Sequence, residues 1–199
     1  MRTVGRTALI LVSLLSVGLS TIACTASDRA STATGGASSS ATSQAQATSK
    51  STPPPASKPS GPPCTADDYK VDGQLGSKPT ITVPTGCSPA DGLVVKDVEP
   101  GTGPEIKAGS TASLHYVLAT FSDQKTVEAS WDRGKPFDLK NIGQASVIQG
   151  WNEGLIGLKQ GGRRLLVVPS DKGYGQQGQG TIKPGETLIF VIDAVAVQG

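Results

Sequence analysis

Few residues in this chain of 199 can carry acid–base, nucleophilic or metal chemistry. It has one histidine, His115, and three cysteines, too few for a zinc site of the usual Cys/His type. A Ser-His-Asp hydrolase would depend on His115 alone, and we expect that residue to be a solvent-facing strand residue. The formal net charge is +2 with no lysine- or arginine-rich stripe of the kind that binds nucleic acid. We therefore expect no cofactor, no metal and no nucleic-acid partner.

A glycine-rich segment at 173–178 formally matches the dinucleotide-binding fingerprint. That fingerprint requires a helix to begin at once and an acidic residue ~20 residues further on, within a βαβ unit. Gly180 and Lys183-Pro184-Gly185 follow where the helix should start. The segment is therefore interpreted as a loop, which leaves aromatic and apolar side chains as the remaining candidates for chemistry.

The elements that must position those side chains belong to a compact α+β domain beginning at Gly92. In the segment from Thr111 to Phe121, Leu114, Tyr116 and Leu118 fall on one face of a strand, because successive side chains of a strand alternate. The sequence predicts strands at 93–95, 111–121, 163–169 and 187–197.

One helix is expected. Apolar residues recur at helical spacing from Val147 to Leu158, with Ser146 as a plausible N-cap and Gly157 as a plausible stop, which predicts about three turns. Several strands and one short helix favour a twisted antiparallel sheet packed on that helix.

Short motifs in a fixed order resemble the FKBP-type peptidyl-prolyl cis-trans isomerases. They are Leu-His-Tyr at 114–116, Arg-Gly-Lys-Pro-Phe at 133–137, Val-Ile-Gln-Gly-Trp at 147–151, Gly-Gly-Arg-Arg at 161–164, Gly-Tyr-Gly at 173–175 and Glu-Thr-Leu-Ile-Phe at 186–190. The resemblance spans roughly residues 92–199. It implies an antiparallel twisted β half-barrel wrapped around one short α-helix. It also implies isomerase activity on proline-containing polypeptides and, as further ligands, immunosuppressant macrolides.

The resemblance also implies an apolar pocket with Trp151 as its floor. The backbone amide of Ile148 and the hydroxyl of Tyr174 would hydrogen-bond the peptide carbonyls on either side of the proline. Taken singly, the tryptophan and phenylalanines would be ordinary core residues; the motif order favours the pocket. The residues so assigned as catalytic are Tyr116, Glu128, Phe137, Val147, Ile148, Trp151, Tyr174 and Phe190, and those assigned to substrate binding are Val127, Arg133 and Ile182.

The chain departs from the family pattern at two places. Family members usually have Phe-Asp where this chain has Val127-Glu128, so an aromatic wall is lost and the pocket acid is one methylene longer. We expect Glu128 still to pair with Arg133. The loop before Pro184 is one residue short, which makes the position of Ile182 the less secure assignment.

Residues 1–23 are interpreted as an export signal, with Arg2 and Arg6 before an apolar stretch from Ala8 to Leu19. Thr21-Ile22-Ala23-Cys24 resembles the lipobox of bacterial lipoproteins, in which the cysteine is lipidated. We therefore expect an extracytoplasmic protein anchored to the cell membrane through Cys24. An ordinary secretory signal cleaved near Ala23 and an uncleaved anchor are the alternatives.

Between the signal and the main domain lie two further segments. Residues 24–63 comprise the lipidated cysteine and a linker rich in Ser, Thr, Ala, Gly and Pro. The linker has no large apolar side chain whose burial could offset the entropy cost of ordering its backbone, so we expect it to be disordered. Residues 64–91 are interpreted as a short β extension with a strand at 80–83. In an exported protein Cys64 and Cys87 are expected to form a disulfide, the alternative being two free buried thiols.

Three functions remain open from the sequence. The leading hypothesis is a monomeric isomerase that assists the folding of exported proteins. The main alternative is a non-catalytic proline-peptide-binding or chaperone module tethered to the membrane. The third is a surface adhesin or scaffold in which the domain at 92–199 serves only as a stable head.

Overall fold

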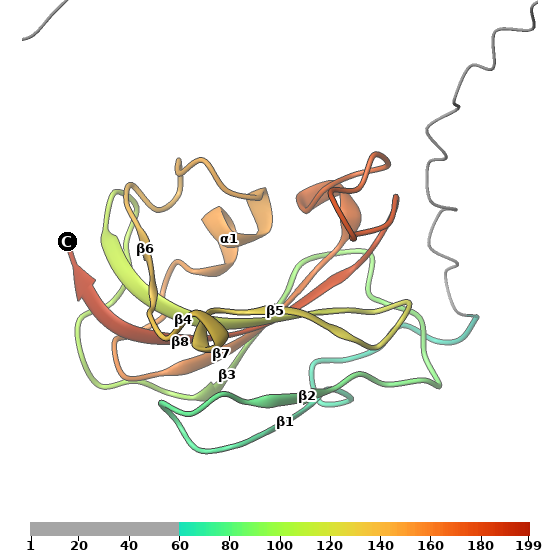
Figure 1. Ribbon diagram of the computed structural model, residues 1–199, viewed down its shortest axis with the longest axis horizontal. Helices are drawn as coiled ribbons and strands as arrows, with labels where there is room; N and C mark the ends of the chain where they lie inside the picture. The colour runs from blue at the N-terminus through green and yellow to red at the C-terminus, as the bar shows by residue number, and fades with distance from the viewer. Residues whose placement is uncertain (1–59) are drawn as a thin grey trace, which may run out of the picture. The chain divides into compact units, whose positions relative to one another are not determined.

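The computed structural model describes residues 60–199 (Figure 1). The export signal at 1–23, Cys24 and the linker up to residue 59 lie outside the described residues, so these predictions stay predictions. Within 60–199, no helix is long and apolar enough to cross a membrane.

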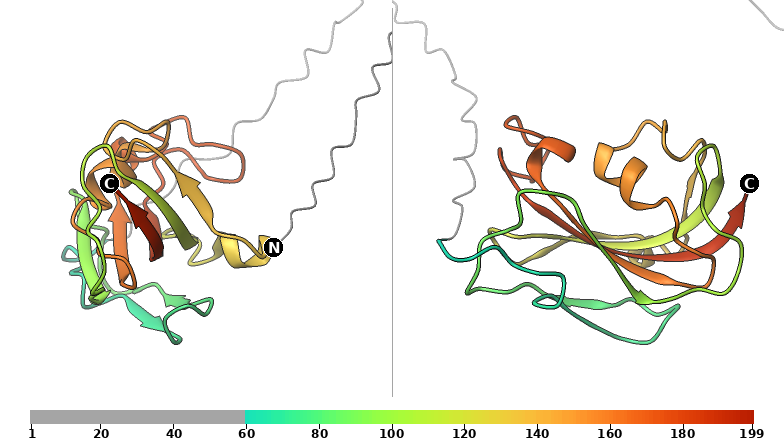
Figure 2. Two further views of the ribbon diagram at one scale, coloured as in Figure 1. Left: turned by 90° about the vertical axis from the view of Figure 1, so that its left-hand side faces the viewer. Right: turned by 180° about the vertical axis from the view of Figure 1, so that it is seen from behind.

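A six-stranded antiparallel sheet forms the centre of the described chain (Figures 1 and 2). Its order is β3-β7-β8-β4-β5, and β6 pairs with the half of β4 that β5 leaves open. The strands are β3 (Val94–Glu99), β4 (Thr111–Thr120), β5 (Thr126–Ala129), β6 (Phe137–Leu139), β7 (Arg163–Val168) and β8 (Leu188–Gln198). The predicted antiparallel half-barrel around one short helix is confirmed.

Both faces of the sheet are covered, and the sequences of β7 and β8 show why. Residues 165–168 of β7 and 188–192 of β8 are continuous apolar runs, so residues pointing to either face of the sheet are buried. Leu166, Phe190 and Ile192 face the helix side, whereas Leu165 and Val191 belong to a second core on the other face. The helix-side core also contains Leu114, Tyr116, Leu118, Trp151, Leu155 and Leu158.

The N-terminal extension, residues 64–91, covers the second face. Its strands β1 (Lys70–Asp72) and β2 (Thr80–Thr82) form a two-stranded antiparallel sheet of their own. Tyr69 and Val83 of the extension pack with Leu165, Phe121 and Val191 of the main sheet. Cys64 and Cys87 are joined by a disulfide, with their Cα atoms 5.1 Å apart. The extension is therefore packed onto the main sheet through residues near both of its ends and from both of its strands.

The helix α1 (Gln149–Gly154) is shorter than the sequence predicts, and Ser146 does not cap it. The residue before the first turn is Ile148, with an extended backbone at φ −57°, ψ 148° and no side-chain cap. The preceding loop is held in a non-helical shape by Asn152, whose Oδ1 accepts the N–H of Gly143 at 3.0 Å and of Ala145 at 2.9 Å.

The helix α1 packs closely against β7. A Cβ at Gly150 would lie 2.4 Å from Cγ1 of Val168, and one at Gly154 would lie 2.8 Å from Leu166. Only glycine permits this close approach of helix to sheet. Beyond Gly154 the chain turns, and Gly157 adopts φ +85°, a left-handed conformation that ends the helical path.

Candidate active site

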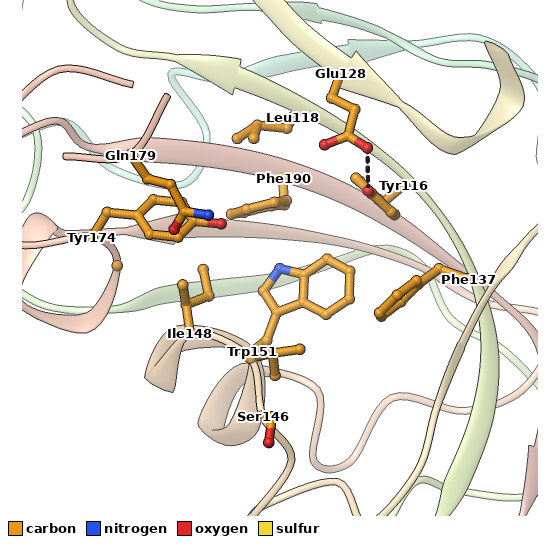
Figure 3. Close-up of a pocket in the computed structure, with 12 residues that line it drawn as sticks. Tyr116, Leu118, Glu128, Phe137, Ser146, Ile148, Trp151, Tyr174, Gln179 and Phe190 are labelled. Atoms are coloured by element: carbon orange, nitrogen blue, oxygen red, sulfur yellow. Dashed lines mark hydrogen bonds between the residues drawn. The ribbon is translucent and has the colours of Figure 1, made fainter. Parts of the chain in front are cut away.

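A cavity of about 480 Å³ opens between the sheet and α1 (Figure 3). All of the residues assigned as catalytic from the resemblance line it, although they come from β4, β5, β6, β8, α1 and the loops at 146–148 and 173–179. The lining residues are Tyr116, Leu118, Glu128, Phe137, Ser146, Val147, Ile148, Trp151, Gly173, Tyr174, Gln179 and Phe190.

Aromatic rings form the floor and walls of this cavity. Trp151 is only 4% exposed, and three rings stand edge-on to it: Tyr116 with centroids 5.3 Å apart, Phe190 at 5.4 Å and Phe137 at 6.0 Å. Edge-to-face contacts are the favoured geometry for aromatic pairs. The indole is therefore held by its neighbours on several sides, which makes the floor a preformed apolar surface.

One wall carries a polar cluster of Tyr116, Glu128 and Arg133. The Tyr116 hydroxyl donates to Oε1 of Glu128 at 2.8 Å and accepts from Nη2 of Arg133 at 3.1 Å. Nη1 of Arg133 also donates to Oε1 of Glu128. Burial raises the pKa of the Tyr116 hydroxyl above its usual value, an effect that Arg133 opposes and Glu128 reinforces. The hydrogen bond to Tyr116 in turn raises the pKa of Arg133. At neutral pH the cluster therefore contains a neutral phenol and a charged guanidinium.

Two hydrogen-bond donors at the cavity have no partner among the described residues. Ile148, as the N-cap of α1, has an N–H group that the helix does not use, and the hydroxyl of Tyr174 makes no hydrogen bond within residues 60–199. Burial raises the pKa of Tyr174, and the charge of Glu128 raises it further. Tyr174 therefore keeps its proton at neutral pH and is available as a donor.

His115 is half-buried rather than solvent-facing, and it does not line the cavity. Its ring stacks on Trp131 with centroids 4.6 Å apart, and its Nδ1 lies 2.8 Å from Oγ of Ser130. Within residues 60–199 no group of three or more His, Cys, Asp or Glu side chains is arranged to hold a metal ion. The cavity therefore has the chemistry of an apolar binding site with hydrogen-bond donors at its edge.

Comparison with known proteins identifies this arrangement. The sequence profile of the FKBP-type peptidyl-prolyl cis-trans isomerases matches residues 103–195. An FK506-binding protein of Streptomyces anulatus is 48% identical over 122 residues, which are 60% of this chain and 97% of that relative. This chain belongs to the FKBP-type peptidyl-prolyl cis-trans isomerase family. The family and the activity class predicted from the motifs are confirmed.

Two further proteins are similar to this chain. A probable FK506-binding protein of Corynebacterium glutamicum is 40% identical over 119 residues, covering 60% of this chain and 98% of the relative. Among solved structures, FkpA from Escherichia coli is 36% identical with a TM-score of 0.49, covering 54% of this chain and 48% of that one.

The three residues assigned to substrate binding do not line this FKBP-type cavity. Ile182 is 7% exposed and belongs to the helix-side core, and its backbone pairs with that of Gln179 through two hydrogen bonds of 2.9 and 3.0 Å. Gln179 lines the cavity in its place. Val127 is 38% exposed, and Arg133 reaches the cavity only through its contacts with neighbouring side chains.

A β-bulge explains the position of Val127. On β4, Leu118 is paired with Glu128 and the next residue, Ala119, with Thr126, which leaves Val127 without a partner across the strands. The sequence analysis missed Leu118, which lines the cavity two residues after Tyr116 on the same face of β4. Strand alternation already put Leu118 on that face, whereas no sequence signal distinguished Gln179.

Proposed function

We propose that this cavity binds the proline ring of a peptide and catalyses rotation about the preceding X-Pro bond. The observation that carries the proposal is an aromatic-walled cavity with two unused donors at its edge, the N–H of Ile148 and the hydroxyl of Tyr174. These donors would hold the peptide carbonyls on either side of the proline. The substrate would then be fixed at both ends while the bond between them turns.

The reaction needs no nucleophile. Rotation must break amide resonance, a barrier of ~18–20 kcal/mol, without breaking a covalent bond. The twisted amide has lost its charge-separated resonance form, so an apolar surface such as Trp151 favours it over the planar ground state. Each ~1.4 kcal/mol of that preference speeds the reaction about tenfold.

Glu128 would support the same cavity indirectly. Its contacts with Tyr116 and Arg133 hold the tyrosine ring in its edge-on position above Trp151. The longer acid thus fills the role that an aspartate has in the family pattern. Relatives of this chain are named FK506-binding proteins, and the same cavity would take macrolides of that class.

Exchange NMR on a short proline-containing peptide separates catalysis from binding alone. Substoichiometric protein should produce exchange between the cis and trans resonances of the peptide. Broadening or shifts without cis–trans exchange would favour the non-catalytic binding module instead.

We further propose that the enzyme works outside the cytoplasm as a membrane lipoprotein. The support is the charged and then apolar order of residues 1–19 followed by the lipobox-like Thr21–Cys24. A diacylglyceryl group supplies two chains, which is what stable anchoring requires. Metabolic labelling with a fatty acid should mark the native protein and not the Cys24→Ala variant, which should leave the membrane fraction. An unlabelled native protein would contradict the lipoprotein form.

A further inference from the structure

The turn Gly73–Lys78 joins β1 to β2 (Figure 1). A buried ion pair of the main sheet binds this turn. Arg163 has a fully buried side chain and is paired with Asp193 at 2.6 and 2.8 Å. Its remaining donors bind three carbonyl oxygens of the turn at 2.8–3.1 Å, those of Gly73, Gln74 and Ser77. Asp193 accepts the N–H of Gly76 at 3.0 Å. The pair is therefore satisfied only with the turn in place.

The same turn also contacts the short 3-10 helix η1 (Ser130–Arg133). Nζ of Lys78 lies 2.6 and 2.9 Å from the two carboxylate oxygens of Asp132. Nε1 of Trp131 donates to the carbonyl of Gly76 at 3.5 Å. The turn therefore joins β7 and β8 to η1.

The segment η1 carries residues that reach the cavity wall. Ser130 is fully buried, and its Oγ accepts the N–H of Tyr116 at 2.9 Å. Arg133, at the other end of η1, contacts the Tyr116 hydroxyl and Glu128. A one-turn segment with no side-chain cap depends on its neighbours for its position. These neighbours are β4 on one side and the extension turn on the other.

We propose that the turn Gly73–Lys78 is a positioning element of the catalytic site. The turn binds Asp132 and Trp131 and so fixes the position of η1. Arg133, which belongs to η1, is thereby held where it can bind the Tyr116 hydroxyl and the Glu128 carboxylate. A site works best when the groups behind its contacting residues are themselves fixed. The extension lies before residues 103–195, which the family profile matches, and its role in the site rests on the proposed function of the cavity.

The test compares two charge-neutralising variants of the full chain. Asp132→Asn removes the ion pair between the turn and η1, whereas the matched control Asp67→Asn removes the pair of the extension with Lys96 (2.5 Å), which does not involve η1. For an exposed pair, we expect Asp132→Asn to lower kcat/KM about threefold without a change in Tm. The control should leave kcat/KM unchanged, and the charge-exchanged double variant Lys78→Asp/Asp132→Lys should restore it.

A double-mutant cycle shows whether the effect passes through Arg133. In an Arg133→Met background, Asp132→Asn should have no further effect on kcat/KM. Equal values for Asp132→Asn and Asp67→Asn, or an undiminished effect in that background, would overturn the proposal. The dissociation constant of a proline-containing peptide, measured on the same variants, supplies a readout that does not need turnover. A native protein without turnover would refute the proposed function, while the binding cycle would still decide the role of the turn.

Discussion

Nζ of Lys172 lies 2.9 and 2.8 Å from the two carboxylate oxygens of Glu153, and this ion pair joins the two sides of the cavity. Glu153 lies on α1, whose N-cap is Ile148, whereas Lys172 ends η2 (Ser170–Lys172), two residues before Tyr174. The pair thus links the elements that present the two donors to the substrate.

Breaking this pair should weaken catalysis modestly. Glu153→Gln is expected to lower kcat/KM about twofold to threefold, since exposed pairs contribute little, and the exchanged variant Glu153→Lys/Lys172→Glu should recover it. Lys172 lowers the pKa of Glu153, so the contribution is complete above the ordinary glutamate pKa and is lost as the pH falls through the lowered one. Kinetics at low and high salt, and from neutral pH down into the acidic range in which Glu153 takes up its proton, provide the measurement. A variant equal to the native enzyme at low salt would exclude this role.

Tyr174→Phe deletes one hydroxyl and almost no volume. If that hydroxyl donates to a substrate carbonyl, kcat/KM should fall by about 0.5–1.5 kcal/mol in activation free energy, the net value of a neutral hydrogen bond. Steady-state kinetics on a proline peptide measures it, and unchanged Tm shows that folding is unaffected. Native kcat/KM in this variant would mean that the hydroxyl does not bind substrate.

Tyr69 should make stability sensitive to alkali. Its hydroxyl is buried with no hydrogen-bond partner among residues 60–199, and burial raises its pKa to about 12, with Asp68 adding to the shift. Because the pKa of Tyr69 is higher in the folded than in the unfolded state, its protonated form favours folding. This contribution to the free energy of unfolding is complete below about pH 10 and is lost as the pH rises from there to the folded-state pKa of about 12. Tyr69→Phe should raise the free energy of unfolding by up to about 1 kcal/mol at neutral pH and reduce the alkaline loss. Urea unfolding at neutral and alkaline pH measures both, and identical pH profiles would contradict the prediction.

The disulfide should support stability more than catalysis. Cys64 and Cys87 are 23 residues apart, and closing a loop of that size contributes about 3 kcal/mol in the chain-entropy description. The double variant Cys64→Ser/Cys87→Ser should lose about that much free energy of unfolding. Its kcat/KM should stay within about twofold of native, because Arg163 still holds the turn Gly73–Lys78. A large loss of activity in the folded variant would show that the disulfide itself shapes the cavity.

Strand alternation predicted the cavity face of β4, because each of Leu114, Tyr116 and Leu118 is followed by a residue of the other face. The short strands β5 and β6 escaped prediction because a run of three or four residues is too short to establish a period. The bulge at Val127 further removes the alternation in β5. Periodicity is thus informative only where a strand is long and buried on one face.

Helical spacing overestimated α1 because apolar side chains continue at Leu155 and Leu158 after the helix has ended. Leu155 and Leu158 reach the core from the turn that follows the helix, so their spacing in the sequence resembles that of a helix although the backbone is not helical.

The contacts of Arg163 with the extension join residues about 90 positions apart, and no local sequence pattern predicts such a contact. The apolar runs on both faces of β7 and β8 were the available sign that a further segment covers the sheet.

The most direct test measures the rate of prolyl cis–trans isomerisation with the purified protein and its Trp151→Leu variant. Trp151→Leu keeps an apolar floor but removes the aromatic surface under the twisted amide. The native protein should accelerate isomerisation in proportion to its concentration, and the folded variant should lose at least about tenfold in kcat/KM, equivalent to ~1.4 kcal/mol. Native protein that is folded yet gives no acceleration, or a variant as fast as the native enzyme, would contradict catalysis at this cavity.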